Sequence, residues 1–169
     1  FGLPHQSFAN WGRTLREAAR CGLSHISLYQ LSLEEGTPWA SLDEKTLGDG
    51  YAAYRWAQWY LPRKGYAQYE VANFARPGSE SLHNINYWRE GEYLGAGPGA
   101  AGCLSGLRYK NFGDLRRYAA ALSRGELPVA ESERLPFEKS AREAAVLGLR
   151  MTAGIDRTDS TEWYGENSL

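Results

Sequence analysis

The sequence predicts an α/β fold over most of the chain, followed by a small, mainly helical region. A helix pattern followed by a strand pattern occurs twice in the first half, over 7–22 and 25–31 and then over 44–61 and 66–71. After Asn111 the pattern changes to charged amphipathic helices. With 19 glycines and 7 prolines in 169 residues, many turns are expected. We therefore expect one domain at 1–112 and a second region at 113–169.

The first helix is predicted from a cap and an apolar stripe. Ser7 can accept a hydrogen bond from the helix N-terminus, and Gly22 is a typical helix end. The residues expected to face inward are Phe8, Trp11, Leu15 and Ala18. HISLYQL at 25–31 then predicts a strand, and Phe1 is expected to be the last residue of a preceding strand.

The second helix is expected at 44–61, ended by Pro62 and Gly65. Its predicted inward side carries Leu47, Tyr51, Tyr54 and Leu61. Strands at 25–31 and 66–71 separated by a long helix predict parallel pairing through a right-handed crossover. Ligands bind at the carboxyl ends of such strands, which places segments 2–6, 32–38 and 72–102 on one functional rim.

The later part of the chain predicts two amphipathic helices. The expected stripes are Leu115, Tyr118, Ala119 and Leu122 in the first, and Ala141, Ala145 and Leu149 in the second. SRGELPVAESERLP at 123–136 is expected to link them.

The segment from Tyr69 to Gly102 is the main functional candidate, since its composition predicts an irregular loop region. His83 lies beside Asn84 and close to Tyr87 and Trp88. An imidazole can ligate a metal or haem iron, and aromatic faces can stack on a planar ring. From the residue chemistry alone, a structural histidine that is hydrogen-bonded within a loop is the favoured interpretation.

Two glycine-containing turns are further candidates. In GLPHQ, Gly2 allows a tight turn and Gln6 can present an amide to a polar ligand, although a plain connecting turn has the same composition. Residues 97–102 match the spacing G-x-G-x-x-G without a preceding strand or a following helix, so a dinucleotide site is not indicated. We expect a turn whose backbone approaches a flat ligand or a neighbouring strand.

Composition limits the remaining classes of function. A net charge of -1 and a pI of about 6.4 argue against nucleic-acid binding. Cys21 and Cys103 form no C-x-x-C pair, so neither a disulfide framework nor a zinc knuckle is indicated, and a cytoplasmic setting is expected. No apolar run reaches the ~20 residues that a membrane-spanning helix needs.

Five short motifs together resemble the HemN/HemW group of radical S-adenosylmethionine proteins. They are GLPHQ, HISLYQLSLEEGTP, YEVANFARPG, HNINYW and YLGAGPGA, in that order. The resemblance implies the C-terminal part of a partial (β/α)6 radical S-adenosylmethionine barrel, followed by the start of a HemN-type C-terminal region. It further implies a [4Fe-4S] cluster and S-adenosylmethionine in the full-length protein. HNINYW resembles the HemW branch of haem chaperones, which bind haem and deliver it to haem-accepting proteins.

By position, the resemblance implies that Gln6, Arg16 and Ala75 contact S-adenosylmethionine and that His83 contacts haem. Tyr87 and Trp88 would wall the haem ring. The cluster motif C-x-x-x-C-x-x-C is absent from this sequence, so the chain is expected to be a C-terminal fragment that is inactive in radical chemistry by itself. Ala101 stands where many relatives have histidine.

Two other functions remain open at this point. One is an oxygen-independent coproporphyrinogen III oxidase, which converts a porphyrinogen by oxidative decarboxylation. The other is an incomplete barrel without activity, whose exposed sheet edge would favour association.

Overall fold

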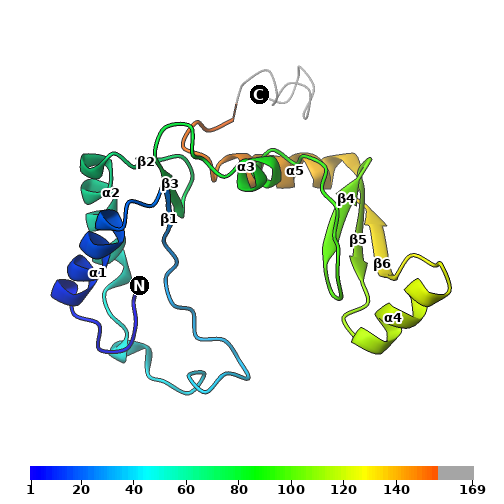
Figure 1. The fold of residues 1–169 in the computed structure, drawn as a ribbon, viewed down its shortest axis with the longest axis horizontal. Coiled ribbons are helices and arrows are strands. Elements are labelled where there is room, and N and C mark those ends of the chain that lie inside the picture. The colour runs from blue at the N-terminus through cyan, green and yellow to red at the C-terminus, as the bar shows by residue number, and fades with distance from the viewer. Residues whose placement is uncertain (156–169) are drawn as a thin grey trace. The chain divides into compact units, whose positions relative to one another are not determined.

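The computed structural model describes residues 1–155, which divide into two compact units (Figure 1). The first is Phe1–Ser81 and the second begins at Leu82. This division differs from the domain boundary expected at residue 112, which stays a prediction. Residues 156–169 of the expected second region lie outside the described residues. Among residues 1–155, no helix is both long enough and apolar enough to cross a bilayer.

The first unit packs two helices against a small antiparallel sheet. Its helical elements are α1 (Phe8–Arg20), the 3-10 turn η1 (Glu44–Thr46), α2 (Gly50–Tyr60) and the 3-10 turn η2 (Pro62–Lys64). Its strands are β1 (His25–Ser27), β2 (Ala67–Gln68) and β3 (Asn73–Ala75), in the order β1-β3-β2. The core between helices and sheet consists of Trp11, Leu15, Ile26, Leu28, Ala53, Ala57, Leu61, Tyr66 and Phe74.

The predicted parallel pairing of the two strands is wrong, because β3 lies between them and runs antiparallel to both. The sequence analysis missed β3, which consists of three residues directly after a turn. β1 and β2 therefore run in the same direction without being neighbours. A parallel hydrogen-bond pattern occurs instead at Phe1, whose nitrogen donates to Tyr29 O at 2.8 Å and whose oxygen accepts from Leu31 N at 2.8 Å.

The two predicted helices exist, with different inward faces. In α1 the Ser7 cap is confirmed, and Trp11 and Leu15 are buried, while Phe8 is exposed and packs edge-on against Trp56. For α2 the predicted inward side is confirmed at Leu61, which is completely buried, and is wrong at Tyr51, which is 77% exposed. Asp49 is the N-cap of this helix, and its side chain accepts a hydrogen bond from Ala52 N. Its buried residues include Ala53 and Ala57, whose small side chains allow close approach, and Trp11 Nε1 donates to Ala53 O at 2.9 Å.

The second unit contains α3 (Leu82–Trp88), α4 (Leu115–Ser123), α5 (Phe137–Gly148) and a sheet of three antiparallel strands. The strands are β4 (Ala101–Leu104), β5 (Leu107–Asn111) and β6 (Val129–Arg134), with β5 in the centre. The expected linker 123–136 therefore contains an edge strand. Its alternate residues are charged and exposed, which hid the strand pattern.

Both later helices form, with stripes other than those predicted. In α4 the buried residue is Ala121, and Leu115 is 67% exposed. In α5 Ala141 is buried as expected, together with Ala144. Leu149 is exposed beyond the helix end.

Candidate functional site

The HNINYW motif forms helix α3, so the expectation of an irregular loop is wrong for these residues. Helical geometry brings residues i and i+4 to one face, and the rings of His83 and Tyr87 meet edge to face at 4.6 Å. Tyr87 also contacts the ring of Tyr93 at 4.3 Å. His83 is exposed, and within residues 1–155 its imidazole has no hydrogen-bond partner. The structural interpretation, a histidine bonded within a loop, is therefore not what is seen.

A cavity of about 230 Å³ lies beside this helix. Its lining comes from α3, from β4 and β5, and from α5: Tyr87, Trp88, Glu90, Gly91, Tyr93, Cys103, Arg108, Glu143 and Leu147. Ligand pockets commonly enclose ~300–1,000 Å³, so this cavity suits a small group or the edge of a larger ligand. A planar macrocycle would have to lie mainly on the exposed face carrying His83 and Tyr87.

An ion-pair network crosses the cavity. Arg108 Nη1 donates to both carboxylate oxygens of Glu143, at 2.9 and 2.7 Å, and Arg108 Nη2 lies 3.8 Å from Glu90 Oε1. The hydrogen bond to Glu143 raises the pKa of Arg108. Burial raises the pKa of Glu90, against the lowering effect of Arg108. Burial, and next the neighbouring Tyr87, raise the pKa of Tyr93.

Two polar atoms in this lining have no hydrogen bond among the described residues, Trp88 Nε1 and Glu90 Oε1. The indole ring of Trp88 is covered by the guanidinium of Arg150 at 4.3 Å. The structure thus brings His83 and Tyr87 together, while Trp88 lines the cavity and its ring stacks on the Arg150 guanidinium.

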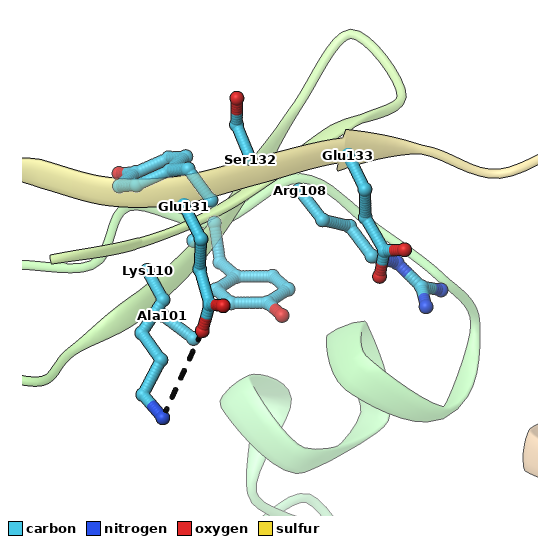
Figure 2. A pocket seen from close by; sticks show the side chains of 9 residues that line it. Ala101, Arg108, Lys110, Glu131, Ser132 and Glu133 are labelled. Atoms are coloured by element: carbon cyan, nitrogen blue, oxygen red, sulfur yellow. Dashed lines mark ion pairs between the residues drawn. The ribbon is translucent and has the colours of Figure 1, made fainter.

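A second, more open cavity of about 390 Å³ lies on one face of the sheet β4-β5-β6 (Figure 2). Glu131 and Glu133 point to the same side as Arg108 and Lys110, and Ser132 points to the other (Figure 2). Lys110 and Glu131 form an exposed ion pair at 4.0 Å. Exposed pairs of this kind contribute about 0–1 kcal/mol. We interpret this face as a solvated charged surface.

The glycine-rich turn at 95–102 approaches a neighbouring strand, which is one of the two arrangements expected from the sequence. A Cβ at Gly95 would lie 2.4 Å from Ala101 O, and one at Gly102 would lie 2.3 Å from the Tyr109 ring. The turn is held by Tyr109 Oη, which accepts from Gly95 N at 2.9 Å, and by Asn111 Nδ2, which donates to Gly95 O and Gly97 O at 3.0 and 3.1 Å. These close contacts explain Gly95 and Gly102, and the positive φ of Gly97 (110°) and Gly99 (71°) explains the other two glycines without a ligand.

In the first unit, Gln6 closes its own turn. Its Oε1 accepts from Gly2 N at 2.8 Å and from Leu3 N at 3.3 Å, and Gly2 has a φ of 77°. The end of Gln6 that remains for a ligand is the amide NH₂. A small cavity of about 50 Å³ adjoins this turn.

The three residues expected to contact S-adenosylmethionine lie on three different elements. Gln6 precedes α1, Arg16 is exposed on α1, and Ala75 is in the central strand β3. Ala75 is completely buried, opposite His25 and Ala67 in the sheet register. His25 Nε2 lies 2.8 Å from Tyr69 Oη, which also accepts from Ser81 N at 3.3 Å.

Sequence reasoning missed Glu90, Tyr93, Arg108 and Glu143. They lie on a loop, a strand and a helix that are far apart in the sequence, from Glu90 to Glu143. No spacing rule connects these positions. No sequence signal could have found them, because the pairing of Arg108 with two acidic residues exists only in the folded chain.

Among family models, none matches this chain. Curated relatives do match. The sequence is 31% identical to the "Heme chaperone HemW" of Bacillus subtilis, over 99% of this chain and 46% of the relative. It is 35% identical to that of Lactococcus lactis, over 92% of this chain and 42% of the relative. The bovine "Radical S-adenosyl methionine domain-containing protein 1, mitochondrial" is 44% identical over 60% of this chain and 24% of its own length.

A solved structure has a similar fold. "Coproporphyrinogen III oxidase (HemN) from Escherichia coli" superposes with a TM-score of 0.77 at 16% identity, covering 96% of this chain and 42% of the other. At this identity the likeness shows the fold alone. It agrees with the α/β class and with part of a radical S-adenosylmethionine barrel. The chain spans less than half the length of these relatives.

Proposed function

Because the chain belongs to the HemW/HemN family of radical S-adenosylmethionine proteins, we propose that it forms the part of a HemW-like protein that binds haem through His83. The protein would pass this haem to haem-accepting proteins in the cytoplasm. The name "Heme chaperone HemW" carried by relatives supports the ligand. The observation that carries the proposal is the exposed, unbonded imidazole of His83 beside the ring of Tyr87.

The chemistry of this face suits a tetrapyrrole that must be released again. A neutral imidazole nitrogen ligates haem iron, and the edge-on ring of Tyr87 offers apolar contact to a macrocycle lying over it. Because His83 lies on the surface, a haem bound there stays accessible to an acceptor. Trp88, beside the cavity, would contact the edge of the ring.

S-adenosylmethionine is the second proposed ligand. It would contact the side-chain NH₂ of Gln6, and also Arg16 and Ala75. In a radical S-adenosylmethionine protein a [4Fe-4S] cluster supplies the electron that cleaves this cofactor. Among residues 1–155, no group of three or more metal-binding side chains is found, and Cys21 and Cys103 belong to different units. The described residues therefore do not fit the cluster, and we derive no step through it.

A haem titration followed by absorbance tests the proposal, with the longest natural form of the protein. We expect a Soret shift that is lost in His83→Ala. The matched control is His5→Asn, since His5 is exposed and has a φ of 58°, a conformation that asparagine tolerates. This control should keep the shift.

An equal Soret shift in the wild type and in His83→Ala would contradict haem binding through α3. Product analysis with coproporphyrinogen III and a reductant checks the enzymatic alternative. Formation of protoporphyrinogen would replace the chaperone proposal by an oxidase.

A further inference from the structure

The central strand β3 has two faces of opposite chemistry. Phe74 is completely buried in the core beneath α1 and α2. Successive side chains of a strand point to opposite faces, so Asn73 and Ala75 share the face directed away from this core. The residues paired with them in β1 are Ser27 and His25. Asn73, Ser27 and His25 therefore make this face more polar than the face that carries Phe74 and Ile26.

Asn73 is buried without a partner for its side chain. It is 1% exposed, and within the described chain neither Oδ1 nor Nδ2 has a hydrogen bond. Its main chain is bonded, since Asn73 N donates to Glu70 O at 3.3 Å and Asn73 O accepts from Tyr69 N at 3.2 Å. Burying an unsatisfied amide is unfavourable, and most such groups in folded proteins have a protein, water or ligand partner.

The neighbouring polar groups on this face do not supply that partner. The imidazole of His25 is bonded to Tyr69 Oη, which is itself bonded to Ser81 N. Ser27, directly opposite Asn73 in the register, is exposed.

A second buried asparagine shows what a purely structural role looks like in this chain. Asn111 is 4% exposed, and its Nδ2 donates to the main-chain oxygens of Gly95 and Gly97. Asn73 has the same burial and none of these bonds.

We infer that the carboxamide of Asn73 binds S-adenosylmethionine at the site that includes Ala75, an inference that rests on the proposed function. An amide offers one acceptor and two donors. It suits a ligand group that donates and accepts at once, such as a ribose hydroxyl or the amino-acid end of this cofactor. Asn73 is a binding residue in this account, and no chemical step is assigned to it.

Equilibrium dialysis with S-adenosylmethionine tests the inference, on the longest natural form of the protein. Asn73→Leu has a similar shape without the amide. We expect it to bind the ligand at least about tenfold more weakly, with a thermal midpoint equal to or above that of the wild type, because an unsatisfied group has been removed. Phe74→Leu is the control, with a lower midpoint and unchanged affinity.

If Asn73→Leu does not fold, Asn73→Ala removes the amide without adding volume, and the same loss is expected. Binding within about twofold of the wild type in the folded variant would overturn the inference. A wild type that binds no S-adenosylmethionine would overturn both the proposed cofactor and this inference. That failure is recognised without any variant, and it leaves the haem titration unaffected.

Discussion

The sheets β1-β3-β2 and β4-β5-β6 each bury one asparagine in the central strand, with opposite surroundings. In the second sheet, Asn111 holds the glycine-rich turn through two main-chain oxygens. In the first, Asn73 is as deeply buried and its amide has no partner in the described chain. The difference separates an amide that is hydrogen-bonded within the fold from an amide that is buried without a partner in the described chain. It identifies the polar face of β3 as the more promising place for a bound molecule.

The largest expected effect is on the apolar face of the first sheet. Phe74→Ala should reduce the free energy of unfolding by about 3–5 kcal/mol, because a fully buried phenyl ring is lost and a cavity remains. Urea denaturation measures it. Tyr51→Ala, at a residue 77% exposed, is the control and should stay within about 0.5 kcal/mol of the wild type. A small effect at Phe74 would remove the contrast between the two faces of β3.

The next effect tests whether the glycine-rich turn of the second sheet is structural. Gly102→Ala should destabilise by about 1–3 kcal/mol, because its Cβ would lie 2.3 Å from the ring of Tyr109 and displace it. Gly113→Ala is the matched control, since nothing lies within 4 Å of its Cβ. Thermal unfolding of both variants should separate them. Equal midpoints would show that the turn adapts, and would weaken the structural explanation of its glycines.

The smallest effect concerns the pH dependence of the second unit. The pKa of Glu90 is raised from its usual value of 4.5, mainly by burial, so the folded chain holds this proton more tightly than the unfolded chain. This contribution to stability is complete below pH 4.5 and is lost as the pH rises through the raised pKa. Glu90→Gln should therefore lose less stability than the wild type between about pH 5 and pH 7.

Thermal midpoints over this range measure the difference. Glu126→Gln is the control: the hydrogen bond from Arg124 lowers the pKa of Glu126 below its usual value of 4.5, so its pH dependence lies below this range and its profile should parallel that of the wild type. Parallel pH profiles for Glu90→Gln and the wild type would contradict a raised pKa of Glu90 in the folded chain.

Much of the first unit was predictable from sequence because its signals are local. Ser7 and the pair Trp11 and Leu15 define α1 without knowledge of the rest of the chain. β3 was missed because three residues after a turn carry no periodicity. α3 was missed because the asparagines of HNINYW have low helix propensity, and tertiary packing decided the outcome. The motif nevertheless directed attention to His83 and Tyr87, which the helix brings into contact.

The rest of the candidate sites depends on contacts between distant segments. The bond from Arg108 to Glu143 and the absence of a partner for Asn73 exist only in the folded chain. A resemblance that identifies Ala75 gives no reason to select the asparagine two residues before it. That reason comes from the alternation of faces in β3 and from the burial of the amide.

The most direct test of the contrast between the two asparagines is urea denaturation of Asn73→Leu beside Asn111→Leu, without ligand. Asn111→Leu should lose about 1–3 kcal/mol or more, since two bonded main-chain oxygens lose their donor. Asn73→Leu should be as stable as the wild type or more stable, because its amide makes no bond. A loss at Asn73 as large as that at Asn111 would show that both amides are structural, and would contradict a ligand-binding face on β3.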